Sequence, residues 1–133
     1  MRVVVTGATG FIGHHLVNQL RKEGISPVLL TRKVATAQKV FGPDIEAHAW
    51  NPEIEPAPAS VLETADAVIH LAGEGIANRR WTEKQKAKIL NSRILGTRNL
   101  VSAINGLKGK KPSTLISASA IGFYGNRGSE ILN

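Results

Sequence analysis

The sequence has no cysteine, few aromatic residues and no long apolar run. Without cysteine among its 133 residues, the chain can have no disulfide, thiolate zinc site or cysteine nucleophile, which fits a reducing compartment. No apolar run approaches the ~20 residues that span a bilayer. The run that follows Met1 stops at Gly7, too early for a secretory leader with an apolar core of ~7–15 residues. These absences predict a soluble cytoplasmic protein with no membrane partner.

The composition is that of one globular domain, with 42% hydrophobic and 20% charged residues. Collagen-like and largely disordered classes are excluded. A net charge of +7 favours anionic partners, which include nucleic acid, acidic membranes and phosphorylated small molecules. The densest basic group comprises Lys108, Lys110 and Lys111, and no aromatic residue is interleaved with these lysines. We therefore favour a solvated loop there over a nucleic-acid patch, and do not expect a nucleic-acid partner.

Short apolar runs alternate with segments of helical spacing along the chain. Alternating strands and helices favour parallel βαβ units with right-handed crossovers. The fold class predicted is α/β, a Rossmann-like doubly wound parallel sheet of about five strands over residues 1–133. Ligands of such sheets bind outside the carboxyl ends of the strands. Strands are expected over 2–6, 27–31, 46–50, 66–71 and 114–117, and helices over 11–23, 35–41 and 82–106, with an irregular proline-rich connection over 52–58.

The third expected helix has a start signal and an apolar stripe. Thr82 and Gln85 match the capping box, in which each side chain accepts or donates at the other's backbone. Apolar residues recur every three or four positions on one face, which would suit helix pairing in a homodimer. The stripe comprises Leu90, Ile94, Thr97, Val101 and Ile104.

Three glycines at intervals of three follow the first strand, in Thr6-Gly7-Ala8-Thr9-Gly10-Phe11-Ile12-Gly13. Gly7 permits a tight turn, Gly10 lets the backbone approach a pyrophosphate, and Gly13 lets the helix pack closely on the sheet. The N–H groups that open the helix attract the anion. A purely structural turn is the alternative, but the position between a strand and a helix favours dinucleotide binding.

The end of the second strand indicates which dinucleotide is bound. NAD-binding domains usually have an acidic residue there, which accepts a hydrogen bond from the ribose 2′-OH. This chain has Thr31, Arg32 and Lys33 instead, and two cations suit a 2′-phosphate. NADP(H) is therefore expected, with NAD(H) as the alternative if the cations only begin a solvated helix.

Several motifs, taken together, carry a family resemblance. They are Thr6–Gly13, Asp66–Gly73, Ser117–Ala120 with Phe123–Gly125, and Gly73–Ile76 with Arg80–Trp81 and Ser92–Arg93. Through these motifs, which occur in order along the whole chain, the sequence resembles the extended short-chain dehydrogenase/reductases of the NAD-dependent epimerase/dehydratase family. The last set is similar to the branch named for nucleoside-diphosphate-sugar epimerases.

The resemblance implies roles for individual residues. The glycine loop would hold the pyrophosphate, and Arg32 and Lys33 would hold the adenosine-side phosphate. The segment from Leu71 to Gly73 would pass beside the two riboses. Arg93 stands where many members have Asn. Trp50, from its place beside the expected crevice, would either meet adenine or substrate or pack in the core or at the rim. The expected cofactor-binding residues are Gly7, Thr9, Gly10, Phe11, Ile12, Gly13, Thr31, Arg32, Lys33, Trp50, Leu71, Ala72, Gly73 and Arg93.

The resemblance also implies a catalytic serine. This is Ser119, or Ser117 if the sequence is aligned to the family pattern in the alternative register. The family's proton donor and acceptor is the tyrosine of Tyr-x-x-x-Lys, but Tyr124, the single tyrosine, has Gly128 four residues on. We therefore expect this chain to be the NADP-binding portion of an epimerase-like oxidoreductase. It would end before the helix that carries the Tyr-x-x-x-Lys motif in the family, and would be inactive by itself. Its substrate would be a small molecule such as a nucleotide sugar.

Two other functions remain open: a non-catalytic NADP-sensing or interaction module and, less favoured, a basic nucleic-acid-binding domain. No metal site is expected, because His14, His15 and His70 lie in a predicted helix and a buried strand.

Overall fold

The computed structural model describes residues 1–77, 79–119 and 128–131, which form a five-stranded sheet in the order β3-β2-β1-β4-β5. Every pair of neighbouring strands is parallel. The predicted α/β sheet of five strands is confirmed, and the bounds of every predicted helix and strand agree with the expected ones to within one residue. The elements are β1 (Arg2–Thr6), α1 (Phe11–Lys22), β2 (Ser26–Thr31), α2 (Val34–Phe41), β3 (Glu46–Ala49), α3 (Ala59–Leu62), β4 (Ala67–His70), α4 (Glu83–Gly106) and β5 (Thr114–Ser117).

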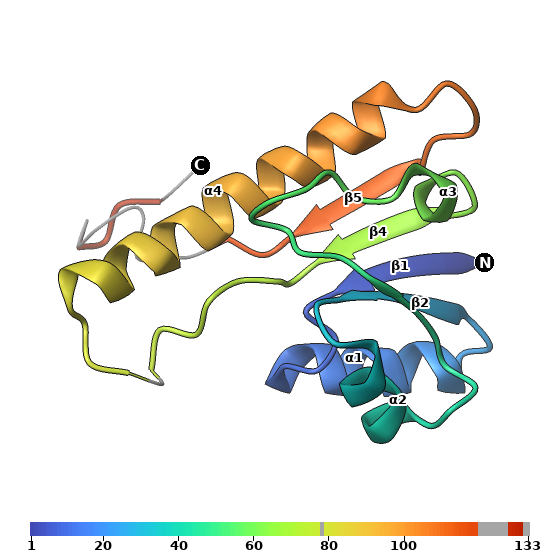
Figure 1. Ribbon diagram of the computed structural model, residues 1–133, viewed down its shortest axis with the longest axis horizontal. Helices are drawn as coiled ribbons and strands as arrows, with labels where there is room; N and C mark the ends of the chain where they lie inside the picture. Colours follow the sequence, from blue (N-terminus) through green and yellow to red (C-terminus); the bar gives the residue numbers. More distant parts are fainter. Residues whose placement is uncertain (78, 120–127, 132–133) are drawn as a thin grey trace.

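The sheet has an apolar core on each face, because successive strand residues point to opposite sides. Val3 and Val5 of β1 pack with residues of α1 and α2, whereas Val4 packs on the other face with residues of α3 and α4. Figure 1 shows α1 and α2 beside β1 and β2, and α4 running alongside β5. Helices therefore cover both faces, as a doubly wound sheet requires.

Helix α4 confirms its predicted start but corrects the prediction of a full capping box. The Thr82 hydroxyl accepts a hydrogen bond from the Gln85 N–H at 3.2 Å. The Gln85 side chain, however, donates to Glu74 at 3.2 Å, and the Thr82 N–H donates to the Arg80 carbonyl. Tertiary contacts thus replace the second half of the box.

The apolar stripe of α4 packs against the core only towards its C-terminal end, where Ile104 contacts the core cluster. The buried residues of the helix are Gln85, Ser92, Gly96 and Leu100, while Leu90 and Ile94 are exposed. Gly96 permits the close approach, since a Cβ there would lie 3.3 Å from the Pro52 Cβ. No helix of the described residues is long and apolar enough to cross a bilayer.

A short helix, α3, which the sequence did not predict, directly follows the proline-rich connection over 52–58. Pro58 has φ −64°, which suits a helix entry, and the Glu63 N–H donates to the Ala59 carbonyl at 2.9 Å. The helix buries Val61 and Leu62 in the core on the α4 side of the sheet. Pro58 therefore stands at the entry of this helix, as its N-cap residue.

Candidate cofactor groove

A groove of about 530 Å³ lies at the carboxyl edge of the sheet, where β1, β2 and β4 end side by side. Its walls come from the end of β2, from the loops that follow these strands and β3, and from one residue each of α1 and α4. Ten of the expected cofactor-binding residues line it, together with six that the sequence did not predict. The lining residues are Gly7, Thr9, Gly10, Phe11, Leu30, Thr31, Arg32, Trp50, Pro52, Glu53, Leu71, Ala72, Gly73, Glu74, Gly75 and Ser92.

The glycine loop is packed so tightly that side chains would not fit. Gly7 has φ 70°, and a Cβ there would lie 2.6 Å from the Leu71 carbonyl carbon. A Cβ on Gly13 would lie 2.7 Å from the Ala8 Cα. Gly7 therefore brings the loop against the end of β4, and Gly13 brings α1 against the loop.

The same loop leaves backbone donors without acceptors at the start of α1. Gly10 caps the helix in an extended conformation, and its own N–H donates to the Gly7 carbonyl at 3.0 Å. Among the described residues, the N–H groups of Phe11, Ile12 and Gly13 have no acceptor. Such free donors at a helix N-terminus attract an anion. This arrangement fits the pyrophosphate of a dinucleotide.

A buried hydrogen-bond network supports the floor of the groove. The Thr6 hydroxyl lies 2.8 Å from His70 Nδ1 and accepts from the N–H groups of Leu71 and Ala72 at 3.2 and 3.1 Å. Because both N–H groups donate to this oxygen, its own proton is directed to Nδ1, so the imidazole proton resides on Nε2. Burial lowers the pKa of His70, which keeps the ring neutral and Nδ1 available as an acceptor.

The β2 side of the groove carries the predicted basic residues. Arg32 lines the groove and is exposed, whereas Lys33 is exposed outside it, and its N–H donates to the Thr31 hydroxyl at 3.3 Å. Trp50 lines the groove but is 2% exposed, and its indole N–H donates to the Glu55 carbonyl at 3.0 Å. At this end of the groove, a ligand would therefore meet the guanidinium of Arg32 and the edge of the buried Trp50 indole.

The opposite wall is held by α4. The Glu74 N–H donates to the Ser92 hydroxyl at 2.9 Å, and Arg93 donates to the Glu74 carbonyl at 3.2 Å. The Glu74 carboxylate accepts from Gln85 and pairs with Lys88 at 3.4 Å. The hydrogen bond from Gln85 is the main reason why the pKa of Glu74 is lowered.

Comparisons with known proteins agree with this geometry. The model of the NAD dependent epimerase/dehydratase family matches residues 3–132. The chain belongs to this family. It is 42% identical over 126 residues to the epimerase family protein YfhF of Bacillus subtilis, which covers 94% of this chain and 39% of that protein.

Solved structures of the family superpose on the chain. Human epimerase family protein SDR39U1, crystallised with NADPH, has a TM-score of 0.73 and 31% identity, with coverage of 93% of this chain and 38% of that one. UDP-N-acetylglucosamine 4-epimerase from Bacillus cereus has a TM-score of 0.67 and 26% identity, with coverage of 100% and 43%. The chain therefore spans about two fifths of the length of these relatives.

Four of the expected cofactor-binding residues do not line the groove: Ile12, Gly13, Lys33 and Arg93. The Ile12 side chain is 66% exposed on α1, and Gly13 is buried against the glycine loop. Arg93 contacts the back of the wall, since a Cβ on Gly73 would lie 3.5 Å from the Arg93 Cζ. Arg93 therefore contacts Gly73 and Glu74, which are part of the groove wall, without lining the groove itself.

The serines implied by the family resemblance lie at the end of β5, next to β4. Ser117 pairs with His70 in the sheet, and the following Ala118 N–H donates to the His70 carbonyl at 3.1 Å. Ser119 is exposed and follows at the same edge, outside the groove lining. Tyr124 lies outside the described residues.

Glu74 and Ser92 are the groove residues whose contact the sequence did not predict. Eighteen positions separate them, so neither local spacing nor helix periodicity indicates that they meet. One feature of the sequence could have indicated that Glu74 and Ser92 belong to the site. Both lie in segments that carry the narrower family resemblance, Gly73–Ile76 and Ser92–Arg93.

Proposed function

We propose that residues 1–133 form a dinucleotide-binding domain that holds NADP(H) in this groove, as the cofactor-binding portion of an epimerase-like oxidoreductase. The observation that carries the proposal is the junction of the glycine loop and α1, beside a groove of about 530 Å³. There the N–H groups of Phe11, Ile12 and Gly13 have no acceptor in the part of the chain that the structure describes. The NADPH bound to the human relative supports the same cofactor for this chain.

The residues present fit both charged parts of the cofactor. The free N–H groups at the start of α1 would bind the pyrophosphate, and Gly10 leaves no side chain in its path. Arg32 would bind the adenosine 2′-phosphate with its planar guanidinium. Thr31, Arg32 and Lys33 contain no carboxylate that would repel that phosphate. This arrangement favours NADP(H) over NAD(H).

The cofactor supplies reversible hydride transfer at the C4 position of its nicotinamide. The Ser119 hydroxyl would donate a hydrogen bond to the oxygen of the reacting alcohol or carbonyl and so orient it. A small-molecule substrate is expected, and the B. cereus relative, named for a nucleotide sugar, supports that class. Because Tyr124 lacks a lysine four residues on, the chain by itself is expected to bind cofactor without turnover.

The exposed part of the α4 stripe supports a homodimer. Leu90 is 57% exposed and Ile94 is 45% exposed, one helical turn apart on the helix. Pairing of two such helices would remove both side chains from water.

The test is a comparison of NADP⁺ and NAD⁺ dissociation constants by isothermal titration calorimetry. NADP⁺ is expected to bind more tightly than NAD⁺. Arg32→Ala should weaken NADP⁺ binding by about 10- to 150-fold, because a hydrogen bond to a charged group contributes about 1.5–3 kcal/mol. NAD⁺ affinity should change by less than about twofold, since NAD⁺ has no 2′-phosphate.

Arg98→Ala is the matched control, because Arg98 is an exposed arginine of α4 that does not line the groove. It removes the same charge and should leave both affinities unchanged. Equal affinity for the two cofactors in the wild type, unaltered by Arg32→Ala, would refute the assignment of NADP(H).

A further inference from the structure

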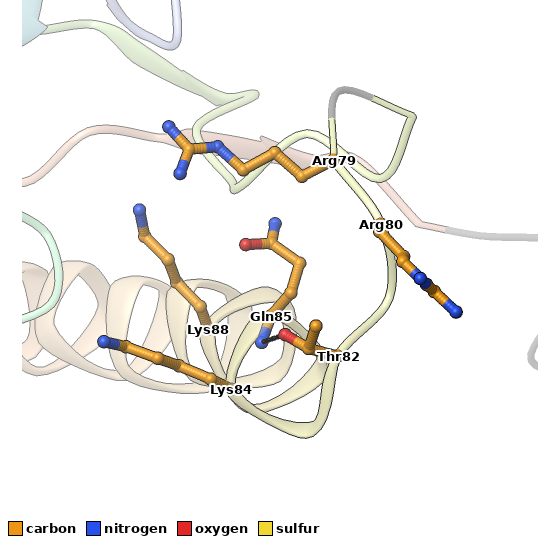
Figure 2. A pocket seen from close by; sticks show the side chains of 6 residues that line it. All are labelled: Arg79, Arg80, Thr82, Lys84, Gln85 and Lys88. Atoms are coloured by element: carbon orange, nitrogen blue, oxygen red, sulfur yellow. Dashed lines mark hydrogen bonds between the residues drawn. The ribbon is translucent and has the colours of Figure 1, made fainter.

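A second pocket, of about 470 Å³, lies between the end of the β4–α4 loop and the first two turns of α4. Four of its six lining residues are cationic, and none is acidic. Figure 2 shows Arg79, Lys84 and Lys88 extending to one side, with the Gln85 amide between them, whereas Arg80 extends to the other side. The lining residues are Arg79, Arg80, Thr82, Lys84, Gln85 and Lys88.

Most of this positive charge has no counter-ion. Within the described residues, only Lys88 of the four cations is paired, with Glu74 at 3.4 Å. Glu83, next in sequence to Lys84, pairs instead with Lys86 at 2.8 Å. Cations gathered in one concave site repel one another, and a bound anion would relieve that repulsion.

The side chains define this site, because the capping position of the helix is already occupied. Thr82 accepts the hydrogen bond of the Gln85 N–H, which occupies the capping position. Arginine and lysine together favour a phosphate, because the guanidinium offers two parallel donors and the ammonium a compact charge.

Glu74 connects this basic pocket to the cofactor groove. Its backbone lies in the wall of the groove, and its carboxylate contacts Gln85 and Lys88, which line the basic pocket. The two sites are therefore neighbours separated by one side chain. A molecule whose phosphate occupies the basic pocket would extend toward the Gly73–Gly75 end of the groove.

We propose that Arg79, Lys84 and Lys88 form an anion subsite that binds a phosphate or diphosphate group of the substrate. This inference rests on the proposed function for the reacting end of the substrate, but the anion site itself does not require the cofactor. The subsite would anchor the substrate away from the reacting carbon, as binding at a distance from the chemistry commonly does.

The test is an NMR titration of the ¹⁵N-labelled chain, saturated with NADP⁺, with inorganic pyrophosphate. Saturation with NADP⁺ keeps pyrophosphate out of the glycine loop. Amide shifts are expected to concentrate within residues 79–88 and to saturate. Lys84→Gln and Arg79→Gln should each raise the pyrophosphate dissociation constant about five- to tenfold, while the NADP⁺ affinity stays the same.

Lys108→Gln is the matched control, since it removes one charge from an exposed lysine in the loop that follows α4. If it weakens pyrophosphate binding as much as Lys84→Gln does, or if the shifts spread equally over residues 108–111, the anion subsite is refuted. A chain that fails to bind NADP⁺ but still shows saturable shifts within residues 79–88 contradicts the proposed function and leaves the subsite supported.

A parallel titration with UDP-glucose separates two sources of the anion. Tighter binding of UDP-glucose than of pyrophosphate, with shifts in the same residues, supports a substrate-borne diphosphate. Tighter binding of pyrophosphate overturns the assignment to the substrate.

Discussion

Replacing Thr6 by valine removes a single hydroxyl from beneath the cofactor groove and keeps the shape of the side chain. This hydroxyl is fully buried and serves three partners, namely His70 Nδ1 and the N–H groups of Leu71 and Ala72. The Leu71 N–H would keep an acceptor, because it also donates to the Thr6 carbonyl at 3.2 Å. The substitution therefore leaves His70 Nδ1 and the Ala72 N–H without partners.

The expected loss of stability follows from the burial of these two groups. A buried polar group without a hydrogen bond costs about 1–3 kcal/mol. His70 is 3% exposed and bears the full cost, whereas Ala72 lies in the groove wall, where water can reach its N–H. Thr6→Val should lower the free energy of unfolding by about 2–3 kcal/mol.

Urea unfolding followed by circular dichroism measures this loss. With an m value of about 2 kcal/mol per molar, the midpoint should fall by about 1–1.5 M while m stays constant. NADP⁺ affinity should fall as well, because Leu71 and Ala72 line the groove.

Thr114→Val is the control, since Thr114 is exposed on β5 and its substitution should change stability by less than about 0.5 kcal/mol. If Thr6→Val unfolds at the same midpoint as Thr114→Val, the hydroxyl does not support the groove and the reasoning fails.

Two further predictions concern the helix that follows the glycine loop and the buried histidine. Gly13→Ala should destabilise the chain by about 1–3 kcal/mol and weaken NADP⁺ binding, because its Cβ would overlap the loop, whereas Gly106→Ala, with nothing within 4 Å of its Cβ, should be tolerated. Thermal unfolding and calorimetry of the two variants check this, and equal behaviour would contradict it. Burial lowers the pKa of His70 below its ordinary value of 6.5. As the pH falls below 6.5, His70 therefore takes up a proton in the unfolded chain before it does so in the folded chain. Stability should therefore fall as the pH decreases through that value, and His70→Gln should reduce this slope in urea unfolding; an unchanged slope would refute the assignment.

Much of the fold could be predicted because it depends on residues close together in the chain. The β-branched run of β1 and the glycine spacing after it indicate a buried strand, a turn and a helix start. Thr82 begins α4 because its hydroxyl reaches an N–H only three residues away. Parallel strands then bring the carboxyl ends of β1, β2 and β4 to one edge, so most of the groove lining was predictable as well.

The face that α4 turns to the sheet was not predictable from hydrophobic periodicity. The hydrophobic periodicity indicates an apolar face through Leu90 and Ile94, but both are exposed, and Ser92, Gly96 and Leu100 are buried instead. The absence of a side chain at Gly96 lets the helix approach Pro52 and His70. Hydrophobicity scales do not register this advantage, because it depends on what lies opposite.

The sequence by itself determined the order of the elements, the glycine loop and the basic end of β2, because each depends on neighbouring residues or on the direction of parallel strands. Only the tertiary structure decided that Thr6 bonds His70, that Gln85 leaves its capping box for Glu74, and that Arg79 and Lys88 line one pocket. These contacts join residues 64, 11 and 9 positions apart, on different elements or on a loop and the helix after it. Side chains at such separations meet only when packing brings their elements together.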